Sequence, residues 1–233
     1  MRALQLVTAG TPLQLRDVPR PAATADNVVV DVAAAGICRS DVHYRAWFPI
    51  VGPLPLTLGH EVAGIVAAVG DAVSEITKGQ RVCIHYQVGC GSCSYCDEGF
   101  EQFCAQGKMI GNGRPGGFAD QIVVPERNVI PVPDAVSLDH AAAMMCSSAT
   151  SLHALRKGRL GAGDTVAVFG VGGLGMSAIQ LALLEGAATV FAVDPNPAKR
   201  EQAAAYGAEP VSYTHLTLPT NVSMCRSRWS PYH

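Results

Sequence analysis

The sequence predicts an α+β fold, with a β-rich N-terminal domain followed by a smaller unit in which strands and helices alternate. Short apolar segments separated by Gly and Pro fill the first part of the chain, and a helical pattern replaces them near residue 139. A strand, a glycine-rich turn, a helix and a second strand then follow in order. We place the first domain at residues 1–140, the second at 141–210, and a tail of different character at 211–233.

The strands of the first domain are predicted from runs that are continuous or alternating in hydrophobicity. These runs are NVVVDVAAAGI (27–37), EVAGIVAAVG (61–70), RVCIHYQV (81–88) and QIVVPERNVIPV (121–132).

The second domain is predicted from a change of pattern. The segment LDHAAAMMCSSATSLHALRK (138–157) indicates a helix, and GRLGAGD (158–164) indicates a turn. The buried-strand run TVAVFG (165–170) opens a βαβ unit that extends to residue 196.

Composition limits the function. The chain has 233 residues, of which 48% are hydrophobic and 15% charged, enough to bury one good-sized core or two modest ones. A formal net charge of -2 without blocks of like charge argues against nucleic acid or anionic lipid as a partner, so we expect a small-molecule partner. The N-terminus lacks the apolar run of a signal peptide, and no run reaches membrane-spanning length, so we expect a cytoplasmic protein.

Four of the eight cysteines lie within the segment GCGSCSYCDEGFEQFC (89–104). Disulfides are rare in a reducing compartment, and short C-x2-C steps let neighbouring thiolates face one ion. The spacing therefore predicts a closed structural zinc site, with an iron–sulfur centre or unliganded thiols as the alternatives. The four residues are Cys90, Cys93, Cys96 and Cys104.

The turn GVGGLG (170–175) matches G-x-G-x-x-G and falls between a predicted strand and a predicted helix. In this motif Gly170 makes the turn, Gly172 lets a pyrophosphate approach the backbone, and Gly175 lets the helix pack on the strand. Asp194 closes the second strand, where an acid takes the ribose hydroxyls and favours NAD over NADP. The alternative is a glycine-rich turn beside a solvated Asp. The predicted cofactor-binding residues of the turn are Gly170, Gly172, Gly173, Leu174 and Gly175.

A second set of metal donors is scattered along the chain: Cys38, His60 and Cys146, with Glu61 next to the histidine. Two thiolates and an imidazole form a Cys₂His set that leaves a position open for water or substrate. The spacing does not bring these residues together by itself, and each has an ordinary alternative as a core cysteine or a hydrogen-bonded histidine.

These motifs, in this order, resemble the zinc-dependent medium-chain alcohol dehydrogenase family. The resemblance rests on CRSD (38–41), GHEVAGIVAAVG (59–70), the four-cysteine lobe and the glycine turn, and it covers residues 1 to about 210. It implies a GroES-like N-terminal domain and a partial Rossmann domain that binds NAD.

The resemblance also assigns residues. Cys38, His60 and Cys146 become ligands of a catalytic zinc, with Glu61 able to approach it, and the cysteine lobe holds a second zinc in each subunit. Asp41 would orient His60.

In the same way Ser40 would contact the substrate oxygen, His43 would end a proton relay, and Thr150 would pack against the nicotinamide. Surface or packing roles remain the alternative for His43 and Thr150. Two aromatic residues, Trp47 and Phe48, are candidates for the wall of the substrate pocket, with an ordinary core role as the alternative. We interpret the remaining residues of interest as structural: Cys83, His85, His140 and His153.

The implied reaction is the reversible oxidation of an alcohol to an aldehyde or ketone, with hydride transfer to NAD. Zinc would act as the Lewis acid on the alcohol oxygen. The resemblance also implies a homodimer or homotetramer for the full-length family.

The tail complicates this prediction. VSYTHLTLPT (211–220) looks like a translated sequencing-library adapter, so we expect residues 211–233 to be non-native read-through and the chain to be a C-terminally truncated copy. A non-catalytic zinc-binding fragment is therefore the alternative function. A nucleic-acid-binding zinc module would need a basic face that the composition does not provide.

Overall fold

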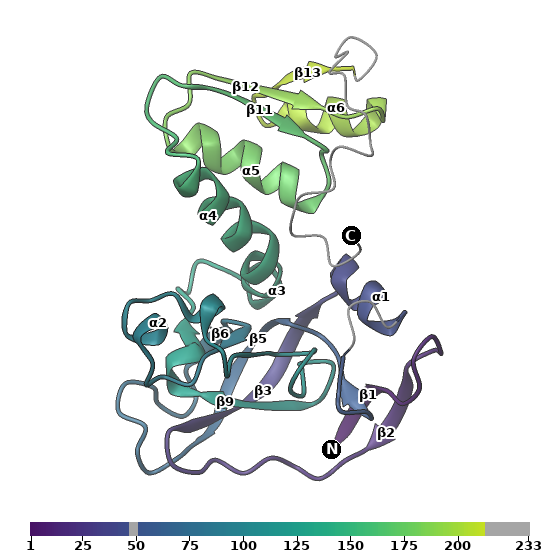
Figure 1. Cartoon of the computed structure of the whole chain (residues 1–233), viewed down its shortest axis with the longest axis vertical. Coiled ribbons are helices and arrows are strands. Elements are labelled where there is room, and N and C mark those ends of the chain that lie inside the picture. The colour runs from purple at the N-terminus through teal and green to yellow at the C-terminus, as the bar shows by residue number, and fades with distance from the viewer. Residues whose placement is uncertain (47–50, 213–233) are drawn as a thin grey trace. The chain divides into compact units, whose positions relative to one another are not determined.

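The computed structural model of the chain describes residues 1–46 and 51–212. The chain divides into two compact units, Met1–Ala149 and the part from Thr150 onward, coloured purple to teal and green to yellow in Figure 1. The predicted pocket residues Trp47 and Phe48, and the tail from residue 213, lie outside the described residues.

A five-stranded antiparallel sheet forms the centre of the first unit, in the order β10-β6-β5-β3-β9. Its core is a cluster of Val and Ile side chains, which suit the pleated surface of a sheet because they are β-branched. The strands are β3 (Asn27–Gly36), β5 (Glu61–Val69), β6 (Arg81–Ile84), β9 (Gln121–Pro125) and β10 (Val129–Pro131).

The predicted strand runs correspond to these elements with two differences. The segment 81–88 contains two strands, β6 and the short β7 (Gln87–Val88), and β7 pairs with β8 (Lys108–Met109). The segment 121–132 contains β9 and β10, separated by the 3₁₀ turn η2 (Glu126–Asn128).

Smaller elements surround this sheet. A second sheet has the order β2-β1-β4, and two short helices and a 3₁₀ turn lie in the connections. These elements are β1 (Arg2–Leu6), β2 (Gln14–Asp17), β4 (Leu56–Thr57), α1 (Arg39–Arg45), α2 (Ser94–Asp97) and η1 (Glu101–Phe103).

The helix predicted over 138–157 is not continuous. It consists of α3 (Leu138–Ala143), a π-helical turn η3 (Met144–Ser148) and α4 (Ala149–Lys157). Helix α3 begins where Ser137 Oγ accepts a hydrogen bond from His140 N–H at 3.3 Å. Its buried face, Ala141 and Ala142, packs against β3 and β5. Single π turns inside α-helices are rare and are frequent at functional sites.

The second unit contains a three-stranded parallel sheet in the order β11-β12-β13. Helix α5 packs against β11 and β12, and α6 packs against β12 and β13. The elements are β11 (Thr165–Phe169), α5 (Gly173–Leu184), β12 (Thr189–Val193), α6 (Pro197–Ala205) and β13 (Glu209–Val211).

The third strand, β13, is formed by the segment EPV (209–211), which the sequence pattern does not identify as a strand. A run of three residues is too short to show a periodicity, and its pairing with β12 supplies the missing information.

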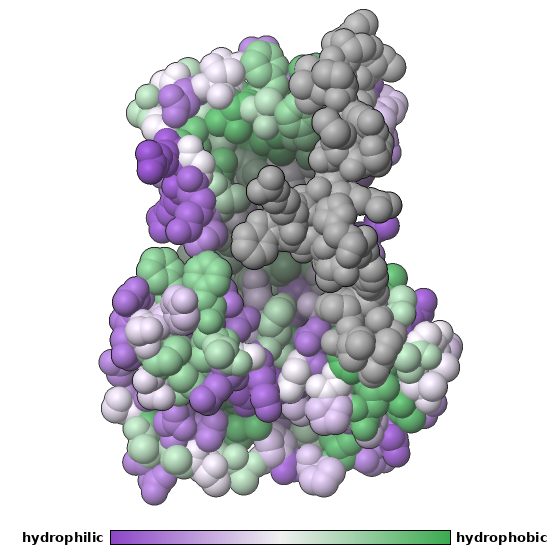
Figure 2. All heavy atoms as spheres, in the orientation of Figure 1, coloured by the Kyte–Doolittle hydropathy of each residue, from purple (hydrophilic) through white to green (hydrophobic). Residues whose placement is uncertain are grey.

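Apolar side chains remain exposed on the second unit. Along β11 exposed and half-buried residues alternate, and Phe169 is 47% exposed. Leu184 at the end of α5 is 82% exposed, and green apolar areas are visible on this unit in Figure 2. Within the described residues, no helix combines the length and hydropathy needed to cross a membrane.

Candidate active site and metal centres

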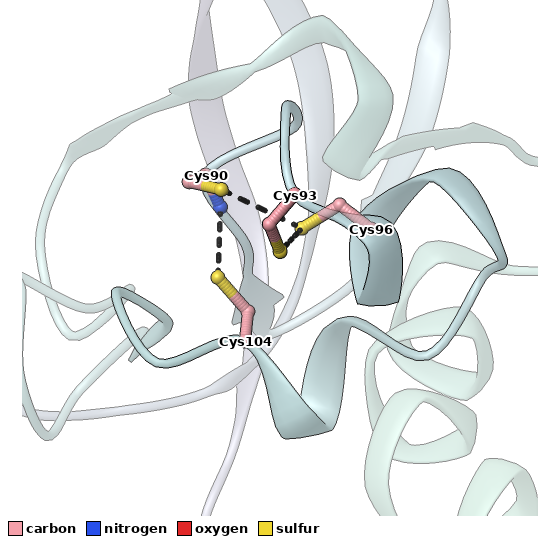
Figure 3. Close-up of side chains that lie close together, drawn as sticks. All are labelled: Cys90, Cys93, Cys96 and Cys104. Atoms are coloured by element: carbon pink, nitrogen blue, oxygen red, sulfur yellow. Dashed lines mark hydrogen bonds between the residues drawn. The ribbon is translucent and has the colours of Figure 1, made fainter.

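The four cysteines of the predicted lobe converge in the structure (Figure 3). Cys90 follows β7, Cys93 precedes α2, Cys96 lies on α2, and Cys104 follows η1. Their sulfur atoms all lie within 4.8 Å of one another. All four cysteines are free thiols, so no disulfide competes for them.

The spacing of these sulfur atoms fits a tetrahedral zinc ion. With Zn–S bonds of about 2.3 Å, the edges of an S₄ tetrahedron measure roughly 3.8 Å. The Cys93–Cys96 and Cys90–Cys96 Sγ distances are 3.6 and 3.9 Å. A disulfide would need about 2.05 Å.

Local contacts shift the pKa values of two lobe thiols in opposite directions. A backbone hydrogen bond at Cys96 lowers the pKa of Cys93, but burial and the neighbouring cysteines outweigh it and raise that pKa to about 11. Backbone and hydroxyl hydrogen bonds from Ser92 lower the pKa of the Cys90 thiol to about 6. Cys90 N–H donates to Cys104 Sγ at 3.3 Å, as Figure 3 shows. Gly89 packs on Cys96 Sγ, which leaves no room there for a side chain.

The scattered donors also come together, from three separate segments of the first unit. Cys38 lies between β3 and α1, His60 and Glu61 lie at the start of β5, and Cys146 lies in the π turn. One ligand atom from each of the four lies within 4.8 Å of the others. Cys38 Sγ is 3.8 Å from Cys146 Sγ, which again matches the edge of a tetrahedral zinc site, roughly 3.8 Å.

The Asp41 carboxylate contacts two of these donor residues, Cys38 and His60, without being a predicted ligand itself. Its Oδ2 accepts the Cys38 N–H at 2.9 Å, and its Oδ1 lies 3.4 Å from His60 Nδ1 and accepts the Gly59 N–H at 3.3 Å. The contact with Nδ1 is longer than an ordinary hydrogen bond, and Nδ1 is buried without another partner. Because Nδ1 faces Asp41, Nε2 is the nitrogen that His60 offers to the cluster.

The electrostatics of His60 reflect its surroundings. Burial lowers its pKa, but the Asp41 carboxylate and the Cys146 thiol outweigh burial and raise the pKa to about 10. A buried imidazole between a carboxylate and thiols is an environment that favours positive charge, and a metal cation is an alternative way to supply that charge.

Glu61 is buried beside His60, and burial raises its pKa, opposed in part by His60 and Cys146. Gly36 lies directly opposite it in the β3–β5 pair. A Cβ on Gly36 would overlap Glu61 Oε2, so the absence of a side chain at position 36 makes room for this carboxylate. Gly36 carries no signal in the sequence, because only the strand register shows which residue it faces.

The predicted relay residues lie on helix α1. Ser40 is half-buried, and its Oγ is 3.6 Å from Cys38 Sγ. His43 is exposed one turn further along the helix. Two aromatic rings that the sequence analysis did not single out border His60: the ring centroid of Tyr86 is at 5.7 Å and that of Tyr44 at 6.4 Å.

The glycine turn forms the start of α5 in the second unit. Gly170 has φ +87°, in the left-handed region that favours glycine. A Cβ on Gly175 would overlap the Gly170 carbonyl, whereas the positions of Gly172 and Gly173 face open space. Leu174 is 49% exposed. The turn therefore combines tight internal packing at Gly175 with free space along its outer edge.

Asp194 follows β12 and is buried against this turn. Its carboxylate accepts the N–H groups of Asn196 and Val171, both at 2.8 Å, and these hydrogen bonds lower its pKa. Lys199 Nζ lies 4.0 Å from Oδ2. The structure thus brings Asp194 to the glycine turn.

Thr150 is exposed on α4, in the same unit as the turn. Its neighbour Ser151 is buried and donates to the Leu174 carbonyl at 2.9 Å, which ties α4 to the first turn of α5. No motif in the sequence marks Ser151, whose role depends on a contact with a residue 23 positions away.

The residues interpreted as structural lie outside both clusters. Cys83 is buried in β6 with its Sγ 3.7 Å from the Ile130 carbonyl, and burial lowers the pKa of His85. His140 and His153 are exposed on α3 and α4.

Comparison with known proteins agrees with this architecture. Residues 24–134 match the alcohol dehydrogenase GroES-like domain family. The chain is 38% identical over 218 residues to an NAD-dependent alcohol dehydrogenase of Sulfurisphaera tokodaii, an alignment that covers 90% of this chain and 63% of the relative.

Solved structures give the same result. A crystal structure of an NAD-dependent alcohol dehydrogenase superposes with a TM-score of 0.87 at 33% identity, covering 97% of this chain and 67% of that one. A zinc-binding dehydrogenase from Sinorhizobium meliloti 1021, bound to NADP, superposes with a TM-score of 0.86 at 34% identity, covering 93% and 63%.

The chain therefore belongs to the zinc-dependent medium-chain alcohol dehydrogenase family. The α+β fold class predicted from the sequence, with a GroES-like domain and a Rossmann-type unit, is confirmed. The chain spans 63% and 66% of the length of two curated relatives, the Sulfurisphaera tokodaii enzyme and a probable formaldehyde dehydrogenase of Bacillus subtilis.

Proposed function

We propose that the protein is a zinc-dependent oxidoreductase that transfers a hydride between an alcohol and NAD. The observation that carries this proposal is the convergence of Cys38, His60 and Cys146, with Glu61, from three distant segments. A Cys₂His set beside a carboxylate is the donor chemistry of an open zinc site. The NAD-dependent alcohol dehydrogenases among the relatives support the choice of reaction and of a small alcohol as substrate.

In this proposal the ion is bound by the thiolates of Cys38 and Cys146 and by the neutral imidazole of His60. Glu61 remains within reach as a further ligand. Zinc bound there supplies a Lewis acid for the alcohol oxygen. Asp41 fixes His60 so that Nε2 faces the ion, as the outer partners of metal-bound histidines do.

The chain's own residues then handle the proton. In the oxidation direction the alcohol loses a hydride from carbon to NAD⁺ and a proton from its hydroxyl. We assign a relay role to Ser40 Oγ, which lies beside Cys38: it takes up that proton while releasing its own hydroxyl proton. We assign delivery of the released proton to solvent to the exposed His43 on the same helix. Residues three apart share a helix face, which suits this pair.

The second unit provides the nucleotide site of the proposal. Free N–H groups at the start of α5 and the open space at Gly172 suit a pyrophosphate. Asp194 suits ribose hydroxyls and would repel a 2′-phosphate, which favours NAD. We assign Thr150 to the nicotinamide side of the same site.

The four-cysteine lobe holds the second zinc ion in this proposal. Four thiolates complete a tetrahedron and leave no position for substrate, so this ion is structural.

For the assembled enzyme we propose a homodimer or a homotetramer. We also propose a cytoplasmic location, because both metal centres need reduced thiols.

A second candidate function is a zinc-binding fragment without turnover. It is favoured by the exposed positions along β11, where Phe169 is 47% exposed.

The test is zinc content per chain, measured beside NAD⁺ reduction with a panel of short primary and secondary alcohols. Two zinc ions with turnover support the dehydrogenase. Two zinc ions without turnover support the fragment. Cys38→Ser is expected to remove one ion and Cys90→Ser the other, and a wild-type chain without zinc contradicts both functions.

A further inference from the structure

The side chains of three consecutive residues in the turn η2 each form hydrogen bonds with the backbone of another segment. Glu126 accepts the N–H groups of residues 74–76, and Asn128 donates to the carbonyls of His85 and Gln87. Between them, Arg127 Nη2 donates to the carbonyl of Gly89, immediately before the first cysteine of the lobe. Neither the metal-site prediction nor the proposed function includes Arg127.

A second observation places Arg127 firmly on the lobe. A Cβ on Gly91 would overlap Nη1 of Arg127, so the guanidinium lies directly on the backbone of the segment 89–91. Gly91 has φ +75°, a conformation that also favours glycine. The position of the guanidinium is therefore fixed on both sides of Cys90.

The Gly89 carbonyl and the Cys90 N–H belong to one peptide group. The carbonyl accepts from Arg127, and the N–H donates to Cys104 Sγ at 3.3 Å. Hydrogen bonds arranged in series polarise one another, and the bond from a guanidinium is charge-assisted. The hydrogen bond from Arg127 polarises this peptide group, which makes the Cys90 N–H a stronger donor to Cys104 Sγ.

The lobe has no cation of its own. Segment 89–104 contains Asp97, Glu98 and Glu101 and no Lys or Arg. Four thiolates on a divalent ion add a net charge of about -2. Arg127 brings a cation from outside the segment to a position where it offsets part of this charge.

We propose that Arg127 is a positioning residue for the four-cysteine metal centre, acting through the Gly89–Cys90 peptide to strengthen the hydrogen bond to Cys104 Sγ and to slow loss of the metal. The inference rests on the metal that the proposed function assigns to this lobe. A hydrogen bond to a metal-bound thiolate withdraws electron density from sulfur, so it also leaves a spectroscopic signature.

The experiment uses the full chain carrying Cys38→Ser and Cys146→Ser, so that Co²⁺ occupies the lobe alone. Arg127→Gln and Arg127→Lys are compared with Arg81→Gln. Arg81 is the matched control, because it also donates to backbone carbonyls, those of Pro133 and Val136, away from the lobe. The readouts are the sulfur-to-cobalt charge-transfer band and the rate of Co²⁺ release to a chelator.

We expect Arg127→Gln to release Co²⁺ about 10 to 100 times faster, in line with the loss of an outer partner of a metal ligand. Its charge-transfer band should shift to lower energy. Arg127→Lys, which keeps the positive charge and N–H donors, should show smaller changes in both the release rate and the band, and Arg81→Gln should show neither change. If Arg127→Gln fails to load, an Arg127→Lys protein that loads and releases faster than the parent supports the same conclusion.

The inference is overturned if the parent binds one Co²⁺ in the lobe and Arg127→Gln changes neither the band nor the release rate. It is also overturned if Arg81→Gln has the same effects, since the role of Arg127 is then general packing. A parent that binds no Co²⁺ in the lobe instead contradicts the proposed metal, and the inference with it.

Discussion

The carboxylate of Asp41 accepts a hydrogen bond from the backbone N–H of Cys38 at 2.9 Å. The same side chain faces His60 Nδ1 at 3.4 Å. One carboxylate therefore fixes the backbone of one predicted metal ligand and the ring of another, and it also links the start of α1 to the start of β5.

Asp41→Asn tests this link. The amide keeps the size and an acceptor oxygen but removes the negative charge opposite Nδ1. We expect zinc affinity at the Cys38 cluster to fall by about 10- to 100-fold, while the four-cysteine lobe keeps its zinc. Competition with a chelator measures the zinc affinity. The control is Asp120→Asn, which removes a carboxylate from the ion pair with Arg2, outside both metal clusters. Equal loss of both ions would contradict a local role.

Gly36→Ala should displace the Glu61 carboxylate, because the new Cβ would overlap Oε2. We expect a loss of stability of about 1–3 kcal/mol, typical of overpacking. The double variant Gly36→Ala/Glu61→Ala should recover much of this loss, because the overlapping atoms are gone. Denaturant unfolding of both single variants and the double variant checks the coupling. Additive effects would show that the two residues do not compete for space.

Glu126 gives a pH-dependent prediction. Hydrogen bonds from Glu75, Ile76 and Ser74 N–H groups lower its pKa below the ordinary value of 4.5. Its contribution to stability is therefore present above about pH 4.5 and is lost as the pH falls through the lowered pKa. Glu126→Gln should be less stable than wild type at neutral pH, and the difference should close below pH 4. Thermal unfolding at several pH values measures it; a difference that widens in acid would contradict the assignment.

The glycine turn offers a matched pair of substitutions. Gly175→Ala would place a Cβ against the Gly170 carbonyl, so we expect a less stable second unit. Gly172→Ala faces open space, so stability should be little changed while dinucleotide binding weakens. Thermal unfolding and equilibrium titration with NAD⁺ separate the two effects. Unchanged NAD⁺ binding in Gly172→Ala would contradict the proposed phosphate position.

Asp194→Asn tests cofactor choice. The amide oxygen can still accept the Val171 N–H, which keeps the contact with the turn, while the hydrogen bond from the Asn196 N–H is lost because the amide nitrogen is not an acceptor. Loss of the charge beside Lys199 should raise the binding of NADP⁺ relative to NAD⁺ by about tenfold, about 1.4 kcal/mol. Titration with both nucleotides measures the ratio, and an unchanged ratio would place the discrimination elsewhere.

The two metal clusters differ in how far the sequence could predict them. Local spacing was sufficient for the lobe, because its cysteines lie within sixteen consecutive residues, 89–104. Cys38 and Cys146 are 108 positions apart, and only the resemblance to a family joined them. The π turn around Cys146 and the neighbours Gly36 and Arg127 depend on register and on long-range contacts, which periodicity does not encode.

The overlap between Arg127 and the space above Gly91 has a consequence for sequence variation. A chain with a side chain at position 91 would need a shorter residue at position 127 to avoid the clash. It would then also lose the donor to the Gly89 carbonyl. Among related sequences, positions 91 and 127 are thus expected to be substituted together or not at all. Gly91 is then under as strong a sequence constraint as the metal ligands, although it is not one of them.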